Sequence, residues 1–400
     1  MKHADKTDAD HLLAALGQMC ECKTDWAASR CFGLTLEWDC ARRRCTISMP
    51  RHVLRALQRF LHARPKRPEH SPHAWQKPTH GAKTQHAPPS DESEPLDAAD
   101  TKFVQEVLGT FLFYARAVDS TMLVAIGTLA TQQSKGTRAT MIALTQLLNY
   151  AATHPDASVL YIASDMCLHV SSDASHHSVP KARSRAAGYH FLSDKPIDPT
   201  KPPLSTDPDP PDNGAIQILC QIMREVLSSA AESELAALFH NGKEACPVRT
   251  CLEELGHPQP PTPIQTDNST AAGIANDNVK QKRSKAIDTR VYWIRDRVRQ
   301  GQFLVYWKKG SRNRGDYFSK HHPTSHHRAI RSACLHEPSD RSRNYFECLQ
   351  DAENSDLPTT SRSVTFADQT APKSARGEGV LISTSPKVTR TSVPRATQTT

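Results

Sequence analysis

The sequence predicts an α/β fold with a mixed sheet of five strands and flanking helices, and three observations support this prediction. Short apolar segments with strand character follow one another between residues 157 and 220. Beyond residue 220 such segments alternate with helical segments, and a strand meander followed by this alternation indicates a mixed sheet. Acidic residues stand at strand ends and helix starts, where α/β folds build their sites.

Periodicity places the elements of this part of the chain. Helical spacing of apolar residues predicts a long helix over 228–254, another that begins at Ser269, and a third over 288–299. A loop rich in Pro and Asp covers 193–213. The five predicted strands cover residues 168–173, 188–192, 215–219, 263–267 and 303–307.

The sequence before this domain predicts two smaller structured units. Residues 1–62 contain two alternating segments typical of a hairpin, at 33–39 and 44–49, and Pro50 then opens an amphipathic helix. Residues 99–156 keep helical spacing and predict a small helical connection module.

Two further segments are predicted to lack fixed structure. Residues 63–98 are rich in Pro, His, Lys and Ser without periodicity, which is typical of a disordered linker. Residues 331–400 are expected to be a largely disordered tail, because few large apolar residues there can offset the entropy of ordering. The α/β domain itself is therefore expected to span 157–330.

The composition limits the class of protein. The 50 Lys and Arg exceed the 42 Asp and Glu, and the net charge of +8 is compatible with a polyanionic partner. No run of about 18 apolar residues occurs and the first ten residues are polar, so neither a membrane span nor a secretory signal is predicted. The 11 cysteines form no CxxC pair, which favours reduced thiols in an intracellular protein over a zinc finger.

Four acidic residues fall where a metal site would need them. Asp173 and Asp267 end strands, Glu234 lies in the first turns of the long helix, and Asp316 is at the start of a final helix. Four carboxylates at one sheet edge would repel one another unless cations held them, and hard oxygen ligands suit Mg²⁺ or Mn²⁺. Two such ions can activate a water and stabilise the leaving oxygen of a phosphodiester. Any one of these acids alone could equally be a solvated charge or a helix cap.

The motifs around these acids resemble the C-terminal part of a copia-type LTR-retrotransposon polyprotein. The family motif CDAD resembles 172–175 (SDAS), and SSTEAEY resembles 228–235 (SSAAESEL). DNQSA resembles 267–271 (DNSTA), and ADxxTK resembles 315–320 (GDYFSK). Residues 160–325 carry the resemblance well, 100–155 are similar to the helical connection before that domain, and 31–62 more loosely resemble the end of the polymerase.

This resemblance implies a ribonuclease H-like fold that cuts the RNA strand of RNA–DNA hybrids with two Mg²⁺ or Mn²⁺ ions. It gives the metal-binding and catalytic roles to Asp173, Glu234, Asp267 and Asp316, with Glu232 as the alternative helix acid. It also implies a cytoplasmic location in a virus-like particle, or a nuclear one. Because the chain contains no aromatic-x-Asp-Asp motif of a polymerase palm, we expect no DNA synthesis.

Basic side chains are expected to hold the nucleic acid through its phosphates. They are interleaved with aromatic residues between 280 and 314, and a solvated helix face with core aromatics is the alternative interpretation for each one. The residues predicted to bind the hybrid are Lys282, Arg283, Lys285, Arg290, Lys308 and Lys309.

Other functions remain open on the sequence alone. A strand-transfer integrase needs its glutamate last in the chain, whereas Glu234 precedes Asp267. A folded nucleic-acid binder with an inactive centre is a second alternative, and a helical interaction protein is disfavoured by the predicted strands. The histidine-rich segment 320–327 could hold a metal, but no Cys pair follows it at zinc-finger spacing, so zinc is not the favoured interpretation.

Overall fold

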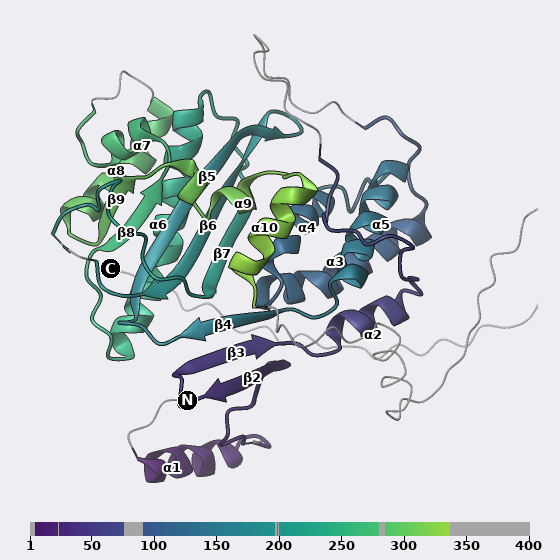
Figure 1. Cartoon of the computed structure of the whole chain (residues 1–400), viewed down its shortest axis with the longest axis horizontal. Coiled ribbons are helices and arrows are strands. Elements are labelled where there is room, and N and C mark those ends of the chain that lie inside the picture. Colours follow the sequence, from purple (N-terminus) through teal and green to yellow (C-terminus); the bar gives the residue numbers. More distant parts are fainter. Residues whose placement is uncertain are drawn as a thin grey trace, which may run out of the picture. The chain divides into compact units, whose positions relative to one another are not determined.

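The computed structural model describes residues 5–22, 24–75, 91–196, 198, 200–279 and 285–336, with the backbone alone for 285–288. Figure 1 shows a strongly twisted central sheet with helices packed against it, and a smaller sheet that includes β2, β3 and β4. No helix in the described residues is both long and apolar enough to cross a bilayer.

The central sheet has five strands in the order β7-β6-β5-β8-β9. The first three are antiparallel neighbours, whereas β8 runs parallel to β5 and β9 parallel to β8. The predicted mixed five-stranded sheet with flanking helices is therefore confirmed. Its strands are β5 (Cys167–Val179), β6 (Arg183–Ser193), β7 (Ala215–Ile222), β8 (Thr262–Thr266) and β9 (Phe303–Trp307).

Both faces of this sheet are covered by helices. The long helix α6 (Ala230–Glu254) packs on β5 and β6, and α7 (Ser269–Ala275) and α8 (Lys285–Arg299) join it around a core that includes Leu168 and Ile264. On β6, Tyr189 and Phe191 instead form a core with Tyr317 and Phe318 of the short helix α9 (Asp316–Ser319). Because successive side chains of a strand point to opposite faces, one strand serves both cores.

The helical module builds a further core of its own. Asp97 caps its first helix, and the buried Asp119 accepts a hydrogen bond from the Thr121 N–H at the next turn, as expected for N-caps. The same core takes in α2 (His52–Arg59) from the N-terminal part. The module consists of α3 (Ala98–Ala117), η1 (Ser120–Met122), α4 (Leu123–Ala130) and α5 (Arg138–Thr153).

The smaller sheet corrects the expected domain limit at residue 157. The predicted hairpin exists as β2 (Leu34–Asp39) and β3 (Arg44–Ser48), with a short β1 (Arg30–Cys31) on one side and a first helix, α1 (Lys6–Gly17), before it. On the other side β3 pairs with β4 (Ser158–Ile162), which was expected to belong to the α/β domain. Val159 of β4 is buried in the core of the helical module, so this strand belongs to the smaller sheet and not to the central one.

The predicted linker and tail are both partly ordered. In the segment before residue 76, Ser71 and His73 are buried, and the Glu69 N–H donates to Thr153 Oγ1 of α5. At the other end, α10 (Thr324–Cys334) continues past residue 330, and Leu335 joins the core of the helical module. The prediction of disorder was therefore wrong for 63–75, for 91–98, where Leu96 packs on the core of the helical module, and for 331–336. Residues 76–90 and 337–400 lie outside the described residues.

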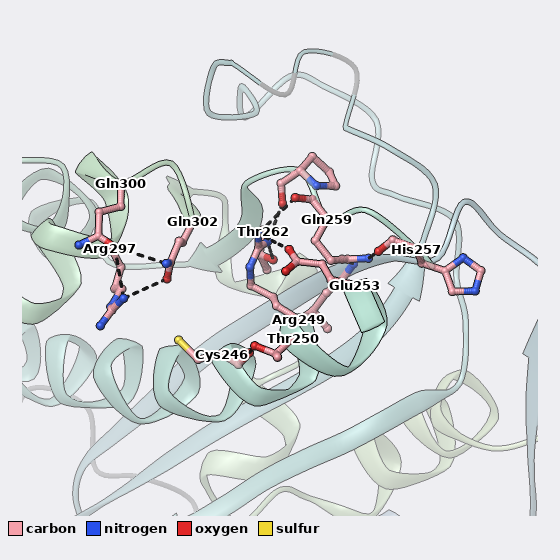
Figure 2. A network of polar contacts seen from close by, with 12 residues as sticks. Cys246, Arg249, Thr250, Glu253, His257, Gln259, Thr262, Arg297, Gln300 and Gln302 are labelled. Carbon is pink, nitrogen blue, oxygen red and sulfur yellow. Dashed lines mark hydrogen bonds and ion pairs between the residues drawn. The ribbon is translucent and has the colours of Figure 1, made fainter. Parts of the chain in front are cut away.

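A polar network fixes the loop between α6 and β8, which leads to the site (Figure 2). The Arg249 guanidinium donates to the Pro260 carbonyl at 2.6 Å and to Thr262 Oγ1 at 2.7 Å, and it pairs with Glu253. Gln259 links the same loop to β5 by accepting from the Leu168 N–H at 3.0 Å. These bonds satisfy buried polar groups that would otherwise destabilise the fold, and they fix where β8 begins.

Several histidines are buried in the neutral form. Burial lowers the pKa of His190, on β6, from its ordinary value of 6.5 to about 4, although a 2.9 Å hydrogen bond with Asn241 opposes the shift. Burial likewise lowers the pKa of His154 to about 3. Between pH 6.5 and 4 the unfolded chain therefore binds more protons than the folded chain, and this contribution to stability falls as the pH drops.

We expect His190→Gln to reduce the pH dependence of stability. Between pH 7.5 and 5.5, wild-type stability should lose about 1 kcal/mol from His190 alone, and the variant should lack that loss. The measurement is urea unfolding at both pH values, with the exposed His11→Gln as the matched control. Equal pH dependence in the wild type and His190→Gln would contradict the prediction.

Candidate metal centre

Three carboxylates meet at one edge of the central sheet. Asp173 comes from the middle of β5, Glu234 from the second turn of α6, and Asp267 from the residue directly after β8. One carboxylate oxygen from each lies within 4.8 Å of those of the other two. The structure therefore brings together three of the four acids that the sequence singled out.

Strand register explains why the two aspartates are neighbours. Val170 of β5 pairs with Ile264 of the parallel strand β8. Asp173 and Asp267 each follow that pair by three residues, so they reach the same level of adjacent strands. The sequence spacing of 94 residues carries no hint of this proximity, which depends on the parallel pairing.

Helix capping explains why Glu234, rather than Glu232, faces the sheet. Ser229 caps α6 by accepting from the Glu232 N–H, and Glu232 turns back to accept from the Ser228 N–H at 2.8 Å. This arrangement is similar to a capping box, except that Glu232 accepts from the residue before the N-cap, and it occupies Glu232 at the helix start. Two residues further on, Glu234 Oε1 accepts from the Ala174 N–H at 3.0 Å and its Oε2 from Thr266 Oγ1 at 3.2 Å.

Asp316 stands beside this trio at the start of α9. The preceding residue, Gly315, lies against Asp173, and after burial the charge of Asp316 is the next cause that raises the pKa of both Asp173 and Asp267. Asp316 Oδ1 is paired with the ammonium group of Lys320, one turn further along the chain. The fourth predicted acid is thus next to the centre but is bound to an internal cation.

The electrostatics of the trio fit a bound cation. Burial first, and then the charge of Asp316, raise the pKa of Asp173 from 3.8 to about 7. Burial and the charge of Asp173 raise the pKa of Glu234 well above its ordinary value, and burial also raises that of Asp267. Asp173 Oδ2 is buried without a hydrogen-bond partner in the described part of the chain. A divalent cation would relieve both the repulsion and this unsatisfied oxygen, and all-oxygen donors suit Mg²⁺ or Mn²⁺.

The segment before Asp316 approaches the strands very closely, which sequence reasoning did not foresee. A Cβ atom on Gly315 would lie 2.8 Å from the Ser171 carbonyl oxygen and 3.2 Å from Asp173 Cβ. Asn313 fixes this approach by donating to the Ser172 carbonyl at 2.8 Å and accepting from the Gly315 N–H at 2.9 Å. The only sequence signal was the glycine itself, immediately before Asp316.

The predicted nucleic-acid contacts are placed in different environments. Arg290 forms an ion pair with Glu225, and Lys309 is exposed. Lys282 and Arg283 lie outside the described residues, and only the backbone of Lys285 is described. The structure therefore leaves Lys309 accessible at the surface.

Lys308 departs from the expectation of a surface contact. Its side chain is 3% exposed, and its Nζ pairs with Asp209 at 2.5 Å and donates to the Asp207 carbonyl at 2.9 Å. Asp209 also pairs with Arg312, and Asp212 pairs with Arg314. The Pro/Asp-rich loop thus neutralises one of the basic clusters, and its residues line a cavity of about 340 Å³ over Lys308 and Tyr306.

Comparisons with known proteins include a sequence relative and several structural likenesses. No family model matches the chain. It is 29% identical over 107 residues to the retrovirus-related Pol polyprotein from transposon TNT 1-94 of Nicotiana tabacum, covering 27% of this chain and only 8% of that polyprotein. The N-terminal RNase H domain of Rv2228c from Mycobacterium tuberculosis aligns with a TM-score of 0.27 and 10% identity, covering 47% of this chain and 99% of that one. The compost-derived LC11-RNase H1 aligns with a TM-score of 0.28 and 8% identity, covering 38% and 93%.

Proposed function

We propose that this chain is a retrotransposon-derived ribonuclease H that hydrolyses the RNA strand of RNA–DNA hybrids. The observation that carries the proposal is the meeting of Asp173, Glu234 and Asp267 at one sheet edge, with Asp316 beside them. The 29% identity over 107 residues to a retrotransposon Pol polyprotein supports a retrotransposon-derived function. The chain spans less than a tenth of that polyprotein, so activity of the whole polyprotein is not carried over.

In this proposal the three clustered carboxylates and Asp316 hold two divalent cations. When bound, such ions lower the pKa of a water nucleophile and stabilise the leaving oxygen of a phosphodiester. The chain's own part is to fix the carboxylates before substrate arrives. The Ala174 N–H and the Thr266 hydroxyl hold Glu234 in place, and the parallel strands hold Asp173 and Asp267 level with each other.

Lys320 has a defined place in this proposal. Its ammonium pairs with Asp316, and although burial opposes the shift, the negative charge of Asp316 raises its pKa. An ammonium group on this carboxylate balances part of the acidic cluster's charge. The side chain would release Asp316 when a divalent cation takes its place.

A cleavage assay on a labelled hybrid tests the proposed function. With the purified chain and Mg²⁺ we expect the RNA strand of an RNA–DNA hybrid to be cut, while the DNA strand and single-stranded RNA persist. Chelation of the divalent cations should stop the reaction. Tight hybrid binding with no cleavage in Mg²⁺ or Mn²⁺ would contradict the proposal and favour a non-catalytic nucleic-acid-binding remnant.

A further inference from the structure

The histidine-rich segment after α9 forms a second group of potential metal ligands. Asp316, His322 and His326 each offer one ligand atom, and these atoms all lie within 4.8 Å of one another. His322 lies just before α10 and His326 is in its first turn, four residues later. This group is distinct in composition from the all-carboxylate trio, because two of its three members are imidazoles.

The two imidazoles are held in place by their surroundings. The His322 side chain is 8% exposed, and its ring stacks on His326 at a centroid distance of 4.2 Å and on Tyr317 at 5.5 Å. Tyr317 is itself fixed by a 2.6 Å hydrogen bond between its hydroxyl and His327 Nδ1. The α9–α10 turn is therefore tied together by ring contacts that would preorganise a small site.

Asp316 presents its two oxygens to different neighbours. Oδ1 is paired with Lys320, while Oδ2 lies 3.8 Å from His322 Nε2. The same residue is electrostatically coupled to Asp173 and Asp267. A cation held by Oδ2 and the two imidazoles would thus share a carboxylate with the neighbouring acidic centre.

The donor set selects the kind of metal. Imidazole nitrogen suits zinc and similar transition metals, whereas Mg²⁺ takes carboxylate, carbonyl and water oxygens. Two histidines and one carboxylate, with a position left for water, are a ligand set of known zinc sites. We propose that Asp316, His322 and His326 bind one Zn²⁺, and that this ion draws Asp316 away from the acidic centre and inhibits hybrid cleavage. The inhibition rests on the proposed function, whereas the zinc site does not.

Cobalt binding to the full chain tests the site directly. Co²⁺ is a spectroscopic substitute for Zn²⁺, and excess Mg²⁺ would occupy the carboxylate trio during the titration. We expect the wild type to show the visible absorption of a four- or five-coordinate Co²⁺ with nitrogen ligands, reversed by added Zn²⁺. His326→Ala should weaken cobalt binding at least about tenfold, whereas the exposed His336→Ala should not. Equal spectra and affinities for the wild type and His326→Ala would overturn the site.

Two further measurements separate this proposal from the proposed function. Asp173→Asn should keep the cobalt spectrum even though it removes a ligand of the acidic centre, so an intact spectrum with no cleavage leaves the zinc site standing. Zn²⁺ should lower the wild-type cleavage rate, with His326→Ala less sensitive when each protein is compared with its own zinc-free rate. Cobalt binding without zinc inhibition of an active wild type would overturn the inhibitory half of the proposal.

Discussion

Asp267→Asn is expected to lower the rate of hybrid cleavage by about 10³-fold or more while hybrid binding stays nearly intact. The asparagine keeps the shape of the side chain but loses its charge, so cation affinity at the trio should collapse. Hybrid affinity should rest on basic residues that contact phosphates, and loss of one negative charge nearby removes a small repulsion. Cleavage and gel-shift assays on one hybrid substrate measure the two effects separately.

The basic segment provides the matching comparison. Joint replacement of Lys282, Arg283 and Lys285 by glutamine should weaken hybrid binding and flatten its dependence on salt, because fewer counterions are released. The gel shifts are therefore run at two salt concentrations for both variants. Cleavage by Asp267→Asn at the wild-type rate would refute the proposal that these carboxylates hold two catalytic metal ions.

Arg331→Met is expected to destabilise the fold by about 3–5 kcal/mol, because it leaves a charged carboxylate buried without its partner. Arg331 Nη1 donates to Asp119 Oδ2 at 2.9 Å, to the Tyr150 hydroxyl at 2.8 Å and to Thr121 Oγ1 at 3.2 Å. Both members of the ion pair are almost completely buried, and they join α10 to the helical module. Urea unfolding followed by circular dichroism measures the loss.

Two controls test whether burial of the Arg331–Asp119 pair causes the expected loss of stability. The double variant Asp119→Leu with Arg331→Met should be less destabilised than the sum of its single changes, since replacing both charges leaves none unpaired. Breaking the exposed pair Arg138–Glu94 by Arg138→Met should cost less than about 1 kcal/mol. An Arg331→Met cost as small as that of the exposed pair would contradict the prediction.

This ion pair also bears on the limits of the α/β domain. Residue 331 lies outside the 157–330 range that the sequence suggested, and its partner Asp119 belongs to the helical module. A chain that keeps the helical module but ends at residue 330 would lose Arg331 and leave Asp119 uncompensated. Because Ile330 and Cys334 of α10 also pack on Tyr189 and Phe191 of β6, the helical module, α10 and the central sheet are parts of one folded unit.

Local pattern was enough to predict the central strands, but not their full extent or the smaller sheet. The apolar run at 303–307 identified β9, because buried strands read as such runs, and the strand predicted at 168–173 is the first half of β5. The second half of β5, rich in Ser and His, was missed because its strand character comes from pairing with β6 rather than from propensity. Residues 158–162 were assigned to the α/β domain and no strand was predicted there, because β3, with which β4 pairs, lies more than 100 residues earlier in the chain.

Site residues that lie in sequence motifs could be predicted. Site residues whose environment depends on tertiary contacts could not. The four acids stood in recognisable motifs, and the structure places Asp173, Glu234 and Asp267 together with Asp316 beside them. The burial of Lys308 depends on Asp209, a residue about 100 positions away, so its charge alone suggested the wrong location. Zinc was not the favoured interpretation of the histidine-rich segment 320–327, because no Cys pair follows it at zinc-finger spacing. That Asp316 lies close to two of these histidines is visible only in the fold.

The most direct test of the central claim compares two glutamates on the same helix. Glu234 lies within the carboxylate trio, whereas Glu232, two residues earlier, caps α6 from outside it. The measurement is the single-turnover rate of RNA-strand cleavage in Mg²⁺ for the wild type, Glu234→Gln and Glu232→Gln. We predict that Glu234→Gln lowers the rate by about 10³-fold or more, while Glu232→Gln cuts within a few-fold of the wild type. Equal rates for Glu234→Gln and the wild type, or loss of cleavage only in Glu232→Gln, would contradict this account.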